Sequence, residues 1–281
     1  MGDKDHASFD SLDAVGPITG YSRSCVSTHL YLENYKLLLD AGPLTCYTPS
    51  SSNATTILVT HLHHDHWTGL ISLLGLKKCR DCFDPVHVYA PRGSIWFLKS
   101  MLMELERRRV LSIMLTPDPD SQQIIKNRIP VVLHELEGNQ HTEASDRLMM
   151  DTFSSSHHCE GVGFKLSIRG ESSKAWTRLL TYTGDTSIAA VDEDALSSPV
   201  LITECTYLES DKTQKALERG HMSLDNIVDI ESGFKGQKLL LMHFKDSYKK
   251  KEIHEAIESR EFMRVKPKAI CTEISDARTG T

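Results

Sequence analysis

Four histidines and one aspartate lie within residues 60–66, which read THLHHDH. Imidazole nitrogens and carboxylate oxygens are the ligands that hydrolytic zinc and manganese sites use, and a carboxylate can also bridge two ions. The apolar segments ATTILV and WTGLISLLGL flank the run, which argues against a solvated histidine tract. The pattern therefore predicts a metal site inside a folded domain.

The spacing within this run predicts two metal positions. Side chains alternate along an extended segment, so His61 and His63 point the same way and can bind one ion. Asp65 and His66 follow at the point where the chain turns, and they can face a second ion. On this interpretation His64 points elsewhere.

Further candidate ligands stand at the ends of other predicted strands. One such residue alone is usually a capping or hydrogen-bonding residue, but their recurrence at the same end of successive strands indicates a shared site. The candidates are His157 or His158 in SSSHHCEGVGF, Asp185 in TYTGDTS, Glu204 in ITECTYL, His221 in RGHMS and His243 in LLLMHF.

The elements that must position these residues are strands in both halves of the chain, with helices between them. This order predicts an α/β sandwich of two sheets with outer helices, as a single domain over 15–281 after a polar extension over 1–14. A hairpin is expected over 29–43. Strands are expected over 54–60, 86–91, 130–136, 147–153, 161–168, 178–183, 199–205 and 238–244, and helices over 66–76, 94–109, 223–234 and 247–260.

The net negative charge excludes the class of proteins that attract nucleic acid through an overall positive charge. The net charge is -6 and the pI is near 6.2, so a polyanion would need a local patch such as 107–109 or 249–251. No stretch approaches the roughly 18 apolar residues of a membrane span, and the N-terminus is too polar for a secretory signal. We therefore expect an intracellular protein, cytoplasmic, nuclear or organellar, with no membrane partner.

The seven cysteines are scattered, which fits a reducing compartment better than a disulfide framework. Cys79 and Cys82 have C-x-x-C spacing, but no second pair completes a zinc knuckle, so they are interpreted as structural or incidental. Cys159 and Cys205 lie near candidate ligands and are expected to be small packing groups.

The order of these motifs resembles the metallo-β-lactamase superfamily and, within it, ribonuclease Z, the endonuclease that trims the 3′ end of precursor tRNA. YKLLLDAG is similar to the first motif, with Asp40 supporting the site, and THLHHDHWTGL is similar to the second. The family places a histidine six residues before a glycine–aromatic pair, which here selects His157 before Gly163-Phe164. The segments TYTGDT, ECTYLESD with ERGHMS, and LLLMHFKDSYKKKEI resemble the later motifs.

The resemblance implies a fold and a metal centre. The fold is the four-layer αβ/βα sandwich of the metallo-β-lactamase type, with two divalent cations, zinc or manganese, at one edge between the sheets. The implied ligands are His61, His63 and His157 for metal one, Asp65, His66 and His243 for metal two, and Asp185 as a bridge between the metals.

The same resemblance implies how the chemistry is divided. Two cations about 3.5–4 Å apart can activate a water and stabilise the charge on a phosphoryl group. Asp65 is implied to orient that water or take its proton. His221, with Glu204 fixing its tautomer, is implied to protonate the leaving 3′ oxygen.

The implied substrate is precursor tRNA and the implied assembly is a homodimer, but one segment departs from the family. Ribonuclease Z carries a tRNA-gripping arm before the Gly-Asp motif, and the interval KLSIRGESSKAWTRLLTYTGD is too short for a sizeable arm. A cyclic-nucleotide phosphodiesterase or an arylsulfatase-like metallohydrolase needs no arm. A non-catalytic partner in RNA processing is a third alternative, although the implied ligand positions all carry competent side chains.

Overall fold

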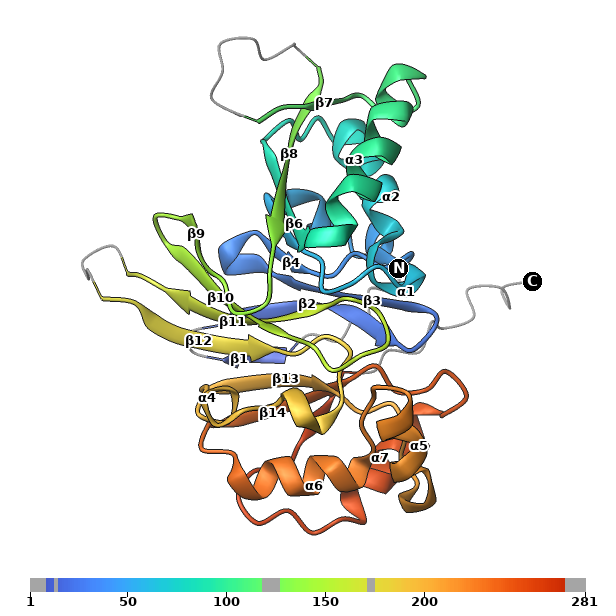
Figure 1. Cartoon of the computed structure of the whole chain (residues 1–281), viewed down its shortest axis with the longest axis vertical. Helices are drawn as coiled ribbons and strands as arrows, with labels where there is room; N and C mark the ends of the chain where they lie inside the picture. The colour runs from blue at the N-terminus through green and yellow to red at the C-terminus, as the bar shows by residue number, and fades with distance from the viewer. Residues whose placement is uncertain (1–8, 13–14, 118–126, 171–174, 271–281) are drawn as a thin grey trace.

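Two β-sheets pack face to face, and helices cover the outer surface of each sheet (Figure 1). The structure is a computed structural model that describes residues 9–12, 15–117, 127–170 and 175–270. The layers follow the order helix, sheet, sheet, helix, so the predicted four-layer αβ/βα sandwich is confirmed.

The first sheet is formed by the N-terminal half of the chain. Its strand order in the described residues is β1-β2-β3-β4-β5-β6-β8-β7. The predicted hairpin is confirmed, since β3 and β4 pair antiparallel, and β4, β5, β6 and β8 then run parallel. The strands are β1 (Phe9–Leu12), β2 (Gly16–Arg23), β3 (Ser27–Leu32), β4 (Leu37–Leu39), β5 (Thr56–Leu58), β6 (Val86–Pro91), β7 (Ile113–Leu115) and β8 (Ile129–Leu136).

The second sheet follows in the order β15-β14-β13-β12-β11-β10-β9. Strands β9 to β12 form an antiparallel meander, whereas β12 to β15 run parallel. The strands are β9 (His141–Ser145), β10 (Leu148–Ser154), β11 (Val162–Ile168), β12 (Thr177–Tyr182), β13 (Val200–Glu204), β14 (Lys238–Met242) and β15 (Lys268–Ala269).

The helices divide between the two sheets. Helices α1 (His64–Trp67), α2 (Gly69–Cys79) and α3 (Arg92–Arg107) belong to the first sheet. Helices α4 (Glu193–Leu196), α5 (Thr213–Glu218), α6 (Leu224–Gly233) and α7 (Lys250–Glu258) belong to the second. Within the described part of the chain, every helix is too short or too polar to cross a lipid bilayer.

Strands buried on both faces explain the uninterrupted apolar runs of the sequence. In β4, Leu37 and Leu39 join the core between the sheets, while Leu38 packs with α2 and α3. In β14, Leu240 faces the inner core, while Leu239 and Leu241 pack under α6 and α7. The alternation of side chains along each strand therefore supplies three hydrophobic layers from two sheets.

The predicted strands and helices are present, with shifted ends. The helix expected over 66–76 is two helices separated at Thr68, and the helix expected over 247–260 begins at Lys250. Part of the predicted N-terminal extension, Phe9–Leu12, pairs with β2, and its other residues lie outside those described. Strands β2, β7, β9 and β15 and helices α4 and α5 were not predicted.

Three rings stack where β6 and β8 lie side by side. His87 Nδ1 and His134 Nε2 are 2.9 Å apart, and the rings of Tyr89 and His134 are nearly parallel at 4.2 Å. Burial, together with the positive charge that His87 can carry, lowers the pKa of His134 to about 4. An unfolded chain would bind a proton at this histidine near pH 6.5, whereas the folded chain resists it.

This difference makes stability depend on pH. Between about pH 6.5 and 4 the unfolded state binds more protons, so stability falls as the pH falls through this window. The variant His134→Phe keeps a ring against Tyr89. Between pH 7 and 4 we expect its free energy of unfolding to fall by about 2–3 kcal/mol less than that of wild type. Urea unfolding of the chelator-treated protein measures this. The control His254→Phe, on the exposed face of α7, should lose as much unfolding free energy as wild type. Equal losses in all three proteins would contradict the assignment of this pH dependence to His134.

Candidate metal centre

Five of the predicted site residues lie at the carboxyl ends of parallel strands in the two sheets. Such ends meet at one edge of a sheet, and here the edges of both sheets come together. Asp40 follows β4, His61 follows β5, Asp185 follows β12, Glu204 ends β13 and His243 follows β14.

The histidine run changes conformation in its middle. The segment up to His63 is extended, and the rings of His61 and His63 lie 4.7 Å apart on the same side. Helix α1 then begins at His64 and turns Asp65 and His66 inward, where both are buried. His64 is exposed, with its Nε2 3.0 Å from the Cys25 carbonyl oxygen, away from the other imidazoles.

Five overlapping groups of ligand atoms result among the described residues, and the atoms of each group lie within 4.8 Å of one another. Two of these groups, called the first and the second group below, share no residue. Asp185 lies between the groups: its Oδ1 is 3.4 Å from His66 Nε2, and its Oδ2 is 3.2 Å from His243 Nε2 and 3.8 Å from His61 Nε2. The first group is His61, His63, His157 and Cys159, and the second is Asp65, His66 and His243.

Hydrogen bonds at Nδ1 leave Nε2 of several histidines directed at the centre. His157 Nδ1 donates to the Gly220 carbonyl at 3.0 Å. Thr60 Oγ1 donates to Asp40 and therefore accepts from His61 Nδ1 at 3.0 Å. Thr206 Oγ1 likewise donates to Glu204 and accepts from His243 Nδ1 at 3.1 Å. Partners of this kind fix the tautomer in which Nε2 carries the lone pair that a metal needs.

Three atoms facing this space are buried without a hydrogen-bond partner among the described residues. They are His61 Nε2, His66 Nε2 and Asp185 Oδ1. Burying a polar atom without a hydrogen bond is costly, and divalent cations bound at this centre would satisfy all three. The donor set of imidazoles and carboxylates therefore fits zinc or manganese.

His61, Asp185 and Asp65 have the charge states that ligands for cations need. Burial lowers the pKa of His61 well below its usual value, so this imidazole is neutral. Burial acts to raise the pKa of Asp185, but the neighbouring His243 and His66 hold that pKa well below its usual value. Burial is likewise outweighed at Asp65, where the hydrogen bond from His243 and the charge of His66 lower the pKa.

A second carboxylate, Asp40, supports the centre from behind. It is fully buried and accepts hydrogen bonds from Thr60 N at 2.8 Å, His66 Nδ1 at 2.8 Å and Tyr182 Oη at 2.6 Å. Its backbone has φ of 56°, a left-handed conformation that non-glycine residues seldom adopt. Because Tyr182 belongs to β12, this carboxylate also ties the second sheet to the first.

The predicted pair of Glu204 and His221 is formed next to both groups. His221 Nδ1 donates to Glu204 Oε1 at 2.8 Å, and the His221 ring lies 4.8 Å from that of His157. Glu204 is fully buried and also accepts from Thr186 N, Thr206 Oγ1 and Met222 N. Burial acts to lower the pKa of His221, but the Glu204 carboxylate raises it to about 9.

The structure separates the histidines that the sequence left open and adds two residues. His157 Nε2 is 3.1 Å from His63 Nδ1, whereas His158 is exposed. Cys159, expected only to pack, has its sulfur within the first group of ligand atoms. Thr206, not singled out in the sequence, links Glu204 to His243. The sequence carries one signal for the role of Cys159, which is its position two residues after His157.

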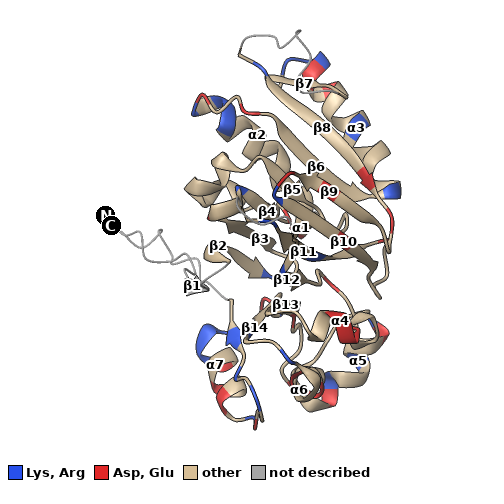
Figure 2. Ribbon diagram, turned by 90° about the vertical axis from the view of Figure 1, so that its left-hand side faces the viewer, with Lys and Arg blue, Asp and Glu red and all other residues tan. Residues whose placement is uncertain are grey.

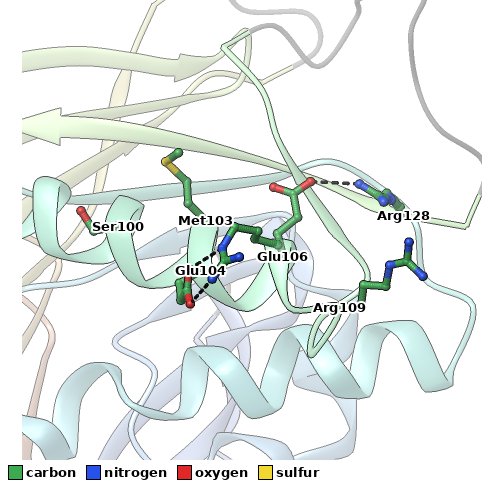
Figure 3. A pocket seen from close by; sticks show the side chains of 7 residues that line it. Ser100, Met103, Glu104, Glu106, Arg109 and Arg128 are labelled. Atoms are coloured by element: carbon green, nitrogen blue, oxygen red, sulfur yellow. Dashed lines mark hydrogen bonds and ion pairs between the residues drawn. The ribbon is translucent and has the colours of Figure 1, made fainter.

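A separate cavity of about 660 Å³ borders the C-terminal half of α3 (Figure 3). Four of its charged side chains form pairs, Arg107 with Glu104 at 2.8 Å and Arg128 with Glu106 at 3.0 Å. None of the candidate ligands lines this cavity. We therefore place the chemistry at the strand ends. Its lining residues are Ser100, Met103, Glu104, Glu106, Arg107, Arg109 and Arg128.

Comparisons with known proteins agree with this geometry. The model of a family described as "Beta-lactamase superfamily domain" matches residues 36–244. The chain therefore belongs to the beta-lactamase superfamily, and with its buried histidine and aspartate groups it is a metal-dependent hydrolase of that superfamily.

Individual relatives are distant. Ribonuclease Z of Alkaliphilus oremlandii is 24% identical over 273 residues, covering 81% of this chain and 85% of the relative. Human tRNase Z, short form, superposes with a TM-score of 0.57 at 19% identity, covering 88% of this chain and 94% of its own. YhfI of Bacillus subtilis, a metallo-beta-lactamase fold protein, superposes at 0.59 and 15% identity, covering 91% and 95%. These structures share the metallo-β-lactamase fold with this chain.

The hydrogen bonds to Asp40 generate a stability prediction. Asp40→Asn leaves buried donors facing an amide, so the free energy of unfolding should fall by about 3 kcal/mol. Tyr182→Phe removes one donor only and should cost about 1 kcal/mol. Urea unfolding of the chelator-treated proteins tests both. Equal losses in the two variants would show that the Asp40 carboxylate has no supporting role beyond its bond to Tyr182.

Proposed function

We propose that this chain is a dinuclear phosphodiesterase of the ribonuclease Z type that cleaves the 3′ trailer of precursor tRNA. The observation that carries the proposal is the Glu204–His221 pair, which stands next to both groups of candidate ligands. Distant relatives named ribonuclease Z, which match most of the chain, support the same reading.

We assign the metal ligands from the two groups and the aspartate between them. When bound, two divalent cations, zinc or manganese, supply Lewis-acid stabilisation of phosphoryl oxygens and lower the pKa of an attacking water. Metal one is assigned to His61, His63 and His157, metal two to Asp65, His66 and His243, and Asp185 to both.

Two side chains of the proposed site handle protons. Asp65 is held in place because its Oδ2 accepts the Cys25 N–H at 2.8 Å and contacts His243 Nε2 at 3.3 Å. Its carboxylate can orient the attacking water and accept a proton from it. His221 has Nδ1 bound to Glu204, so its Nε2–H is free to donate a proton to the leaving 3′ oxygen.

Binding of RNA must use groups other than a long arm. Strands β11 and β12 are joined by residues 169–176 alone, where ribonuclease Z carries its arm. Lys245 is exposed two residues after His243, and three further lysines, 249–251, stand at the start of α7 (Figure 2). We propose that these lysines contact substrate phosphates, and that a second copy of the chain in a homodimer holds the rest of the tRNA.

The short β11–β12 connection favours one rival proposal. A cyclic-nucleotide phosphodiesterase or an arylsulfatase-like metallohydrolase could use the same metal ligands on a small substrate and would need no arm. A non-catalytic role in RNA processing is less well supported, because it gives no reason for the buried, unpaired ligand atoms at the centre.

The metal assignment predicts a specific pattern of losses. Asp65→Ala should reduce hydrolysis of a bis-nitrophenyl phosphodiester by at least about a hundredfold and lower the metal content from two ions per chain, because metal two loses a ligand. His64→Ala and His158→Ala should leave both quantities near wild type. Elemental analysis and initial rates measure the outcome. A fully active wild-type protein with one metal per chain would refute the dinuclear assignment.

The substrate assignment predicts a strong dependence on salt. Binding of 3′-extended precursor tRNA should weaken with a log–log slope of roughly -0.7 to -0.9 per phosphate contact. Changing Lys249, Lys250 and Lys251 to Gln should flatten that slope and slow RNA cleavage, while sparing the small phosphodiester. The matched control changes Lys235, Lys266 and Lys268, which lie before or at the starts of β14 and β15 and not beyond the strand ends that carry the ligands.

A direct substrate comparison decides between the proposals. The purified protein is incubated at low salt with precursor tRNA and, separately, with cyclic AMP. Cleavage of the RNA at its 3′ trailer supports the ribonuclease assignment. Rapid turnover of cyclic AMP with neither binding nor cleavage of the RNA would replace it with the phosphodiesterase rival.

A further inference from the structure

The first ligand group contains one side chain, Cys159, that the assignment of metal one leaves unused. The sulfur of Cys159 lies within 4.8 Å of the ligand nitrogens of His61, His63 and His157. The chain has other cysteines near the centre, but Cys25 is exposed and Cys205 is buried under α6 and α7, and neither joins a ligand group. Cys159 is therefore distinguished by its position.

Hydrogen bonds hold the loop that carries Cys159. The loop runs from β10 to β11, and its base is closed by Ser155 N donating to the Gly161 carbonyl at 3.0 Å. Ser156 N donates to Thr186 Oγ1 at 2.8 Å, which fixes the loop to the segment after Asp185. His157 is tied to Gly220 in turn. The placement of the thiol thus follows from the backbone that also places His157.

An independent observation indicates that this group of ligand atoms binds a cation. His61 Nε2 is buried and has no hydrogen-bond partner among the described residues, and it faces the space that Cys159 borders. Tetrahedral zinc binds nitrogen at about 2.0–2.1 Å and sulfur at about 2.3 Å, which places its ligand atoms about 3.3–3.6 Å apart. His63 Nδ1 and His157 Nε2 are already closer than this, at 3.1 Å, and rotation of the cysteine side chain can shorten the distances from its sulfur.

We infer that Cys159 is an additional protein ligand of metal one, beside the three histidines and the shared Asp185. The thiol binds as a thiolate and releases its proton to solvent. This inference rests on the proposed position of metal one and is independent of the RNA substrate.

A thiolate ligand changes which metal the site prefers. Soft sulfur favours zinc, cobalt and cadmium, whereas manganese prefers oxygen ligands. Cys159 should therefore select zinc over manganese at metal one. It also gives that ion one more protein ligand than metal two has, which leaves metal two as the more open of the pair.

Cobalt substitution tests the inference through a spectrum rather than through activity. The full-length protein, freed of metal and reloaded with two equivalents of Co²⁺, should show a near-ultraviolet sulfur-to-cobalt charge-transfer band. Cys159→Ser should lose that band and bind Zn²⁺ at least about tenfold more weakly, with little change for Mn²⁺. The matched control Cys79→Ser, at the exposed end of α2, should keep both the band and the affinity.

A measurement on the unmodified protein keeps the test decisive if the variant folds poorly. Alkylation followed by peptide mass analysis should label Cys159 in the metal-free protein and spare it in the zinc-loaded protein, while Cys25 is labelled in both. Two bound cobalt ions without the band, or equal labelling of Cys159 with and without zinc, overturns this inference alone. Failure to bind cobalt at all overturns the proposed metal centre as well.

Discussion

The buried carboxylate of Asp40 is the interaction on which the centre depends. Donors from β5, α1 and β12 all converge on it, so one side chain fixes the strand end before the histidine run, the ring of His66 and the opposite sheet. A charge buried at this depth is tolerated only because each donor is in place. The left-handed backbone of Asp40 shows the same constraint, since strain of this kind persists only where the surroundings over-determine it.

Much of the fold was predictable because buried parallel strands carry their own signal. Runs such as IL in β5 and LLLM in β14 are apolar on both faces and short, which distinguishes them from surface helices. The missed elements lack that signal. Strand β9 reads HTEAS and is largely solvent-facing, and β15 has only two residues, so each exists through pairing with a neighbour. Strand β2 was hidden by Pro17 and Gly20, and that glycine is required because a Cβ there would lie 2.1 Å from the His29 carbonyl oxygen.

The metal centre was predictable where residue type and spacing alone indicate metal ligands. Clustered imidazoles and carboxylates at strand ends indicate a metal whatever the fold, and the i, i+2 spacing of His61 and His63 predicts their common direction. Partners at Nδ1 follow no such pattern. Thr206 is an ordinary threonine in the sequence and gains its role because β13 and β14 place Glu204 and His243 on either side of it. Cys159 is informative only once the β10–β11 loop is seen to fold back over the end of β5.

The two sheets contribute to each ligand group in a way that has a mechanical meaning. His61 and His63 come from the first sheet and His157 from the second, while Asp65 and His66 from the first sheet meet His243 from the second. An ion bound by either group would therefore cross-link the two sheets. The two sheets could then separate at this edge only if the ions were released. The edge that performs the chemistry would therefore also hold the two sheets together.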